Sequence, residues 1–268
     1  MTILIVASKR DAAAQNIASE LVRRHEFQPE NEADGDLRRN GEVYLKHVET
    51  DGIYTDSLGF DPEPDAVIFA SRHRSESGEP ALTVHWTGNS TSRADFGGKP
   101  KSLSFSDPPR LRAALLALDQ QRAELNLNYA VSLEATHHGP TELGVPTLFV
   151  EVGSTEKEWN DPQAAAAASE AVWKAATAPA NGKLALGFGG GHYCNKQCMA
   201  IRNDGYAFSH ILSKYFFDEY DEQIVRMAFQ RTQGDCRTAV IDWKGVRAPE
   251  RSKLIETLKQ MNVEIIRV

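Results

Sequence analysis

The chain has 268 residues, 41% of them hydrophobic and 25% charged, which is typical of a folded globular protein and excludes disorder over most of its length. Thirty Lys and Arg against 37 Asp and Glu give a net charge of −7, so the chain lacks the basic footprint of a general DNA or RNA binder. It contains no run of about 18 uncharged apolar residues, and its first residues do not match a signal peptide. We therefore expect a cytoplasmic protein without a membrane span, and the three cysteines do not suggest a disulfide framework.

Short apolar runs alternate with segments of helical spacing along the chain. Buried strands are predicted, in chain order, at 2–7, 42–48, 66–73, 80–85, 129–135, 146–152, 183–189, 238–243 and 263–268. Helices are predicted at 10–25, 109–122, 161–178, 207–216, 219–231 and 248–261, and polar stretches predict loops over 26–41 and 87–107. This order favours an α/β fold, with a mixed central β-sheet flanked by helices. Since sheet elements continue to the last residue, we expect a single domain over residues 1–268.

The strongest local signal is the sequence E-A-T-H-H-G-P at residues 134–140, which directly follows a predicted strand. Functional groups of open α/β sheets gather beyond the carboxyl ends of strands, where this turn is expected. Glu134, His137 and His138 are side chains of the types that bind zinc, and zinc can lower the pKa of a bound water to about 7. The alternative is a histidine pair that only caps a loop through hydrogen bonds.

A run of three glycines, Gly189, Gly190 and Gly191, ends the predicted strand at 183–189. Glycines at such a point let a ligand approach the backbone, whose N–H groups can hold a phosphate or a developing oxyanion. His192 follows at once as a candidate base or metal ligand. Neither a clear helix nor a G-K-[ST] sequence is expected after the glycines, so a dinucleotide or ATP site is not favoured. The alternative is a tight turn with a capping histidine.

Polar side chains also end two further predicted strands, between positions 71 and 89. The candidate substrate-binding residues there are Ser71, Arg72, His73, Arg74, His85 and Asn89. The guanidinium groups of Arg72 and Arg74 can bind a phosphate or a carboxylate. The histidine in the second apolar strand can reach a shared cleft, although a lone strand histidine is more often a core residue. Glu151, at the end of another strand, is a candidate for orienting a histidine.

Taken in order, these segments resemble one protein family. The matching stretches are S-R-H-R-S-E-S-G (71–78), L-T-V-H-W-T-G-N (82–89), S-L-E-A-T-H-H-G-P-T (132–141), V-E-V-G-S-T-E-K-E-W (150–159), G-F-G-G-G-H-Y (187–193) and, near the start, S-K-R-D-x-A-x-x-N-I (8–17). They resemble the archaeal-type D-aminoacyl-tRNA deacylases, also called D-tyrosyl-tRNA deacylases, over nearly the whole chain. One departure is Cys194-Asn195, where the family often has Ala-Pro.

The resemblance implies hydrolysis of the ester between a D-amino acid and the terminal ribose of tRNA, which is a chiral proofreading step. It also implies zinc, with one or two ions per chain, and a fold similar to phosphorylase and peptidyl-tRNA hydrolase domains. The catalytic and metal-binding residues it suggests, as metal ligands or as a base that activates water, are Glu134, His137, His138 and His192. In this interpretation the backbone N–H groups of the glycine run donate hydrogen bonds to a ribose or to the ester carbonyl.

The partner that the resemblance implies is the acceptor end of D-aminoacyl-tRNA. Arg72, Arg74, Lys99 and Lys101 are available for its phosphates. With a net charge of −7, binding would depend on a local basic patch and would be sensitive to salt. We expect a monomer that binds no DNA.

Two other functions stay open at this point. One is another hydrolase or a phosphorylase on the same fold, such as a nucleoside phosphorylase or a peptidase, in which Arg72 and the glycine loop hold inorganic phosphate. The other is an RNA-binding module whose histidine cluster only stabilises the fold through zinc. The acidic composition and the lack of interleaved aromatic and basic residues count against that module.

Overall fold

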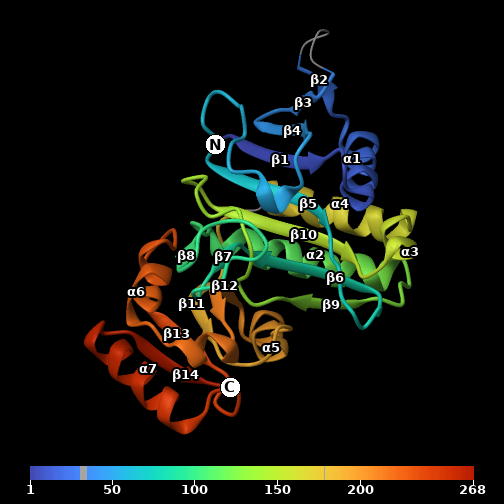
Figure 1. The fold of residues 1–268 in the computed structure, drawn as a ribbon. Helices are drawn as coiled ribbons and strands as arrows, with labels where there is room; N and C mark the ends of the chain where they lie inside the picture. Colours follow the sequence, from blue (N-terminus) through green and yellow to red (C-terminus); the bar gives the residue numbers. More distant parts are fainter. Residues whose placement is uncertain (31–34, 178) are drawn as a thin grey trace.

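The computed structural model describes residues 1–30, 35–177 and 179–268, and most of them belong to α-helices and β-sheets (Figure 1). The large sheet has eight strands in the order β2-β3-β4-β1-β5-β10-β6-β9. Their bounds are β1 (Ile3–Ser8), β2 (Gln28–Pro29), β3 (Leu37–Asn40), β4 (Val43–Val48), β5 (Ala66–Arg72), β6 (Ala81–Trp86), β9 (Ala130–Leu133) and β10 (Thr147–Gly153). Strands β1, β4, β5 and β10 are parallel to one another. Strand β6 runs antiparallel to β10, and β9 is parallel to β6, so the sheet is mixed.

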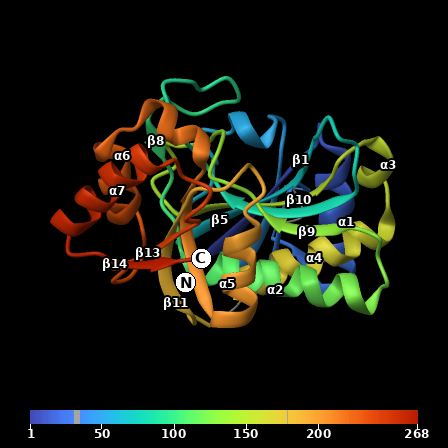
Figure 2. The same cartoon turned by 90° about the horizontal axis from the view of Figure 1, so that it is seen from below.

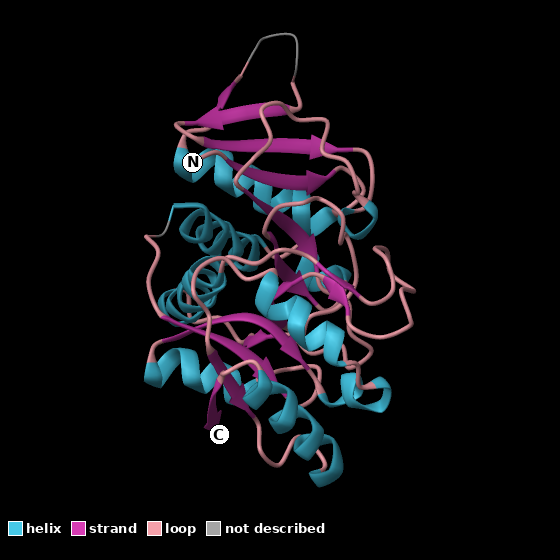
Figure 3. Cartoon of the chain, turned by 90° about the vertical axis from the view of Figure 1, so that its left-hand side faces the viewer, coloured by secondary structure: helices cyan, strands magenta, loops and turns pink. Residues whose placement is uncertain are grey.

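A second, smaller sheet lies toward the C-terminus (Figure 3). Its four strands are all parallel, in the order β12 (Tyr206–Leu212), β11 (Lys183–Phe188), β13 (Thr238–Ile241) and β14 (Glu264–Arg267). A short antiparallel pair, β7 (Gly88–Asn89) and β8 (Ser102–Leu103), lies in the connection after β6. In each sheet the carboxyl ends of the parallel strands lie at the same edge, so segments far apart in the sequence come together there.

Helices cover one face of the large sheet, as Figure 2 shows for α1 (Ala12–His25), α2 (Pro108–Glu124) and α4 (Pro162–Thr177). The remaining helices are α3 (Glu156–Trp159), α5 (Asn195–Asp204), α6 (Glu222–Gln230) and α7 (Ala248–Gln260), with 3₁₀ turns η1 (Gly52–Tyr54) and η2 (Lys214–Glu219). Within the described residues, no helix is long and apolar enough to cross a membrane.

The two faces of the large sheet differ because successive strand residues point to opposite sides. Residues such as Ile68 and Val150 face the helices and join the main core. Phe69 and Phe149 face the other side, where their rings stack at 4.6 Å and loop residues such as Ile53 cover them. The same alternation continues along β5, β6 and β10 to polar side chains, which therefore lie on the face that helices leave uncovered.

The predicted α/β fold with a mixed central sheet is confirmed, and most elements lie within a few residues of their predicted bounds. One prediction is wrong: 207–216 is not a helix, because 206–212 forms β12. Almost every residue of β12 is buried, and a short, fully buried apolar run has no periodicity that separates strand from helix. The predicted loop 26–41 contains β2 and β3, and its residues 31–34 lie outside the described part, as does residue 178. The expectation that no clear helix follows the glycine run is also wrong, because α5 begins at Asn195; the single domain stays a prediction.

Arg110 is a buried cation that ties α2 to the end of α4. It is 5% exposed; its Nε donates to Asp107 at 2.7 Å and its Nη1 to the carbonyls of Ala175 and Ala176 at 2.8 and 3.0 Å. We expect Arg110→Ala to lower the free energy of unfolding by roughly 2–4 kcal/mol, because buried acceptors lose their donor. Urea unfolding measures this. Arg122→Ala, exposed on the same helix, is the control, and equal losses in both variants would contradict the assignment.

Candidate functional site

A cleft of about 400 Å³ opens at the carboxyl ends of β5 and β10, on the side that the helices leave uncovered. Its lining residues are Asp11, Asp51, Gly52, Ile53, Ser71, Arg72, His73, Arg74, Phe96, His137, His138, Glu151 and His192. Glu134 and His85 are fully buried directly behind this lining. The cleft therefore brings together most of the residues that the sequence singled out, although they come from segments far apart in the chain.

Backbone pairing holds the histidine-rich turn in place. His137 forms an isolated β-bridge with Thr87, just after β6, and Glu134 forms another with Tyr193, in the segment after β11. The turn is thus fixed between the two sheets, and its imidazole rings face the same cleft as His192.

His85, His137 and His138 share one hydrogen-bonding pattern. Their Nδ1 atoms lie 3.1, 2.8 and 2.7 Å from backbone carbonyl oxygens. Because a carbonyl oxygen only accepts, each Nδ1 carries a proton, so the Nε2 of each ring has a lone pair whenever that ring is neutral. Burial opposes the imidazolium of His85, but Glu151 and Glu134 outweigh it and raise its pKa, so His85 must lose a proton before it binds a metal. One nitrogen from each ring lies within 4.8 Å of the other two, and this histidine triad can surround a single ion.

The charge state of two of these rings also suits a metal. Burial lowers the pKa of His137 well below its ordinary value, and the neighbouring His85 lowers it further. The same two causes lower the pKa of His138 to about 4. Both rings are therefore neutral near pH 7, which is the form that binds metals. So low a pKa makes His138 a poor general base at neutral pH, so ligation suits it better than proton transfer.

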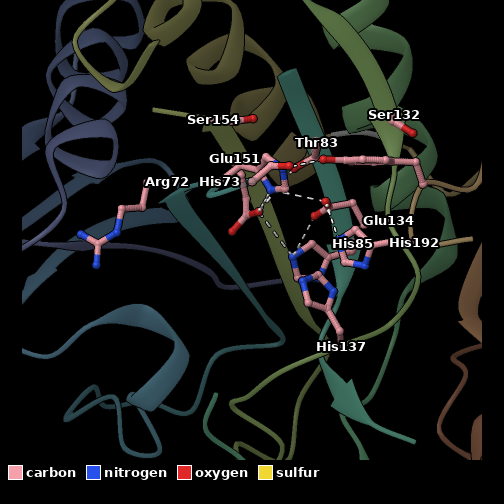
Figure 4. Close-up of polar contacts among 12 residues, drawn as sticks. Arg72, His73, Thr83, His85, Ser132, Glu134, His137, Glu151, Ser154 and His192 are labelled. Atoms are coloured by element: carbon pink, nitrogen blue, oxygen red, sulfur yellow. Dashed lines mark hydrogen bonds and ion pairs between the residues drawn. The ribbon is translucent and has the colours of Figure 1, made fainter. Parts of the chain in front are cut away.

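Two buried carboxylates, Glu134 and Glu151, face the histidines from the other side (Figure 4). The Nδ1 of His73 lies 3.3 Å from Glu134 and 3.4 Å from Glu151. The Nε2 of His85 lies 3.8 and 3.7 Å from the same two groups. Thr83 donates a further hydrogen bond to Glu151 at 3.3 Å. Glu151 thus contacts two imidazoles, the geometry expected of a carboxylate that orients histidines.

His192 is the most accessible member of the cluster, with 41% of its side chain exposed. Its Nε2 lies 3.0 Å from the buried Oε1 of Glu134. The next residue, Tyr193, places its hydroxyl 2.9 Å from the Nε2 of His73. The sequence assigned no role to Tyr193, although its position directly after His192 was the available signal. Asp11, Asp51 and Phe96 also line the cleft without having been predicted. Asp51 and Phe96 belong to none of the matching stretches, whereas Asp11 lies in the stretch 8–17, which was the available signal.

The donor set fits a divalent metal such as zinc. Besides the histidine triad, two further groups bring ligand atoms within 4.8 Å of one another: Glu134 with His137 and His192, and His73 with Glu134 and Glu151. The predicted ligands Glu134, His137, His138 and His192 thus divide between two sets that share His137. The Nε2 of His85 and the Oε2 of Glu134 are buried without a hydrogen-bond partner in the described chain, which is costly unless something else binds them. Imidazole and carboxylate are the ligands that zinc prefers.

Some predicted substrate-binding residues lie outside the cleft. Asn89 donates to the carbonyls of Gly97 and Lys99 and so holds the loop that follows it. Lys99 and Lys101 form ion pairs with Glu142 and Asp221. Gly190 and Gly191 line a different cavity, beside the small sheet, and Gly189 packs against Val246 and Asp242. The reason is that β11 belongs to the small sheet, so the chain reaches the cleft only at His192.

Arg72, Arg74 and their neighbours form the opposite wall of the cleft. Arg72 lies apart from the histidine cluster (Figure 4), where it donates to the carbonyl of Arg10 and lies 3.6 Å from Asp51. Both guanidinium groups lie over the ring of Trp159, at 5.8 and 5.5 Å from its centroid. This wall thus presents two guanidinium groups, of which Arg72 is partly compensated by Asp51.

The buried charges predict how the stability of the metal-free protein depends on pH. Burial opposes the imidazolium of His73, but the hydrogen bond with Glu151 and the charge of Glu134 outweigh it and raise its pKa to about 10. That stabilisation is complete below the unfolded value of 6.5 and is lost as the pH rises toward 10. The lowered pKa of His138 acts oppositely, so stability is lost as the pH falls below 6.5.

We therefore expect the unfolding midpoint of the chelated protein to be highest near pH 6.5. His73→Gln should reduce the alkaline decline, and the part that remains should come from His85, whose pKa the same carboxylates raise against the effect of burial. His47→Gln, outside the cleft, should leave the alkaline side unchanged, because the pKa of His47 is lowered by burial. Thermal unfolding between pH 5 and 9 measures both. An alkaline decline of unchanged size in the His73 variant would contradict the role of His73.

Comparisons with known proteins place the chain in a family. The family model for D-aminoacyl-tRNA deacylase matches residues 60–266. A protein named D-aminoacyl-tRNA deacylase from Methanosarcina barkeri is 35% identical, over 99% of this chain and 89% of its own. One of the same name from Pyrococcus furiosus is 36% identical, over 98% and 99%. The crystal structure of a conserved protein of unknown function superposes with a TM-score of 0.90 at 30% identity, over 99% of this chain and 95% of that one. This chain therefore belongs to the D-aminoacyl-tRNA deacylase family.

Proposed function

We propose that this protein hydrolyses the ester bond of D-aminoacyl-tRNA and releases a free D-amino acid and tRNA. The observation that carries the proposal is the histidine and carboxylate cluster in the cleft of a chain that belongs to this family. Ester hydrolysis needs a water nucleophile, a group that takes and returns a proton, and a positive group near the developing oxyanion. The cleft supplies candidates for each of these.

The metal-binding part of the proposal rests on the histidine triad, His85, His137 and His138. Their free Nε2 atoms would hold zinc, with the carbonyl-bound Nδ1 atoms fixing the orientation of each ring. When bound, zinc would polarise the ester carbonyl and lower the pKa of a water molecule. The group of His73, Glu134 and Glu151 shares no residue with this triad, so it is the candidate place for a second ion. An ion there would have to displace the proton that Glu151 and Glu134 stabilise on His73.

The proton-transfer part of the proposal rests on His192 and Glu134. With the Nε2 of His192 engaged by Glu134, its Nδ1 is left to accept a proton from the attacking water. The buried carboxylate stabilises the imidazolium that forms, in the way a triad carboxylate does. As the ester C–O bond breaks, the same proton passes to the leaving ribose oxygen. The exposure of His192 lets both water and the ribose reach it.

The opposite wall of the cleft would receive the nucleic acid. Arg72 and Arg74 carry positive charge at its edge and suit the phosphates of the acceptor end. Phe96 is 63% exposed and presents a ring to the cleft, on which a base or an aromatic side chain of the amino acid can pack.

Chelation followed by zinc restoration tests the proposal. We expect release of D-tyrosine from D-Tyr-tRNA to stop after chelation and to return when zinc is added back. Release that survives complete chelation would show that the reaction needs no metal, and His192 would then be the proposed activator of water. The complete absence of release, with folded protein and added zinc, would contradict the deacylase function itself, and phosphate-dependent cleavage of a nucleoside would then favour a phosphorylase.

A further inference from the structure

A second cavity, of about 440 Å³, lies at the carboxyl end of β11 beside the cleft. Its lining residues are Gly190, Gly191, Lys214, Tyr215, Phe217, Asp218, Lys244, Gly245, Val246 and Arg247. It contains the glycine run that the sequence singled out and that the proposed chemistry does not use. We call it the glycine cavity.

Packing explains only part of the glycine run. A Cβ at Gly189 would lie 2.6 Å from Val246, and one at Gly245 would lie 2.4 Å from the backbone nitrogen of Gly190, so these two positions must stay small. At Gly191, however, a Cβ would meet nothing within 4 Å. The backbone there borders open space, as it would where a ligand approaches.

The glycine cavity carries an excess of positive charge. Arg247 lies 3.0 Å from Asp218, so these two lining charges compensate each other. Lys214 and Lys244 are exposed, and neither ammonium lies within ion-pair distance of a carboxylate in the described part of the chain. Asp242, beneath the glycines, accepts from the N–H of Gly245 and leaves one carboxylate oxygen toward Gly190.

An exposed aromatic ring accompanies these cations. Tyr215 is 57% exposed, and the Nζ of Lys214 lies 5.1 Å from its ring centroid. Sites that bind single-stranded nucleic acid combine such an aromatic platform for a base with cations for the backbone. The second carboxylate oxygen of Asp242 can accept from an exocyclic amino group or a ribose hydroxyl, whereas a bare anion would gain nothing from it.

Consecutive residues of the chain line the glycine cavity and the catalytic cleft. Gly191 lines the cavity and His192 lines the cleft, and adjacent Cα atoms are about 3.8 Å apart. We propose that the glycine cavity binds the unpaired nucleotide that precedes the aminoacylated terminal nucleotide of the RNA substrate. Its base stacks on Tyr215 and its phosphates contact Lys214 and Lys244. This inference rests on the proposed function, since it assumes that the terminal ribose is held at His192.

The test compares two substrates that differ in the proposed nucleotide. D-Tyr-tRNA contains it, whereas the D-tyrosyl ester of adenosine does not. The variants are Tyr215→Ala, the double variant Lys214→Ala/Lys244→Ala, and Lys253→Ala as a matched control, since Lys253 is exposed on α7 and does not line the cavity. Steady-state kcat and KM are measured for both substrates over a range of salt concentrations.

We expect Tyr215→Ala to raise KM for D-Tyr-tRNA roughly 5- to 150-fold, the range for loss of one stacked base, without changing kcat. The double lysine variant should raise KM and reduce the slope of log KM against log salt by about one for each phosphate that the protein no longer neutralises. Neither should alter hydrolysis of the adenosine ester. Equal losses on both substrates, or none on D-Tyr-tRNA, would overturn the inference. Failure of the proposed function would show separately, as an inactive unmodified protein.

Discussion

Replacing His137 by alanine is expected to abolish deacylation and to remove the zinc held by the histidine triad. His137 belongs to two of the three candidate ligand groups, so only the group of His73, Glu134 and Glu151 would remain complete. Loss of groups that merely support a metal ligand costs about 10- to 100-fold in activity or affinity, and loss of a ligand should exceed this. Bound zinc is measured by elemental analysis, and D-tyrosine release is measured on the same preparation.

The control for this substitution is His47→Ala, because His47 is a partly buried histidine outside the cleft. Its zinc content and turnover should equal those of the unmodified protein. A His137→Ala variant with the same zinc content as the unmodified protein, or one that loses zinc while keeping full activity, would contradict the assignment of the triad.

Replacing His192 by alanine is expected to lower kcat for D-Tyr-tRNA by about 10²–10⁴-fold, the usual contribution of a general acid–base group. Zinc content should stay normal, because His192 is outside the histidine triad. KM should change little, since the substitution removes proton transfer rather than RNA contacts. Glu134→Gln should lower kcat as well, because the carboxylate that stabilises the imidazolium becomes neutral.

The pH–rate profile separates this role from a structural one. The limb of the profile that reports the base should disappear in His192→Ala, and added imidazole should restore part of kcat. An unchanged kcat would contradict the role of His192 as a base. Loss of zinc in this variant would instead place His192 among the ligands, as the group of Glu134, His137 and His192 allows.

The individual chemical groups of this site could be predicted from the sequence, but their pairing could not. The run from Glu134 to His138 reads as a polar turn after a strand, and the structure places it at the cleft. The sequence also suggested Glu151 as an orienting carboxylate, and it contacts two imidazoles. What the sequence does not contain is the alignment of β5, β6 and β10, which brings Phe149 opposite His85 and Glu151 opposite Thr83.

His85 shows why that alignment matters. On its own, an imidazole inside an apolar strand is best interpreted as a core residue. Only the sheet register reveals that it shares a face with Glu151 and that its Nε2 is buried without a hydrogen-bond partner in the described chain. Its partners Glu134 and Glu151 are far from it in the sequence and leave no local pattern, so the case for His85 depends on the three-dimensional structure.

The glycine run was harder to place for a related reason. Its composition indicates a close approach to the backbone, but not which sheet carries it. The small sheet could not be separated from the large one by sequence, and one of its strands, β12, was mistaken for a helix. With β11 in the small sheet, the glycines open toward a neighbouring cavity while His192 turns into the cleft.

The most direct test of the proposed deacylase function is the initial rate of amino acid release from D-Tyr-tRNA and from L-Tyr-tRNA, measured side by side with zinc-loaded protein. We expect rapid release from the D-aminoacyl substrate, while release from the L-aminoacyl substrate stays at the rate seen without protein. Equal rates for the two substrates, or no release from either, would contradict this function.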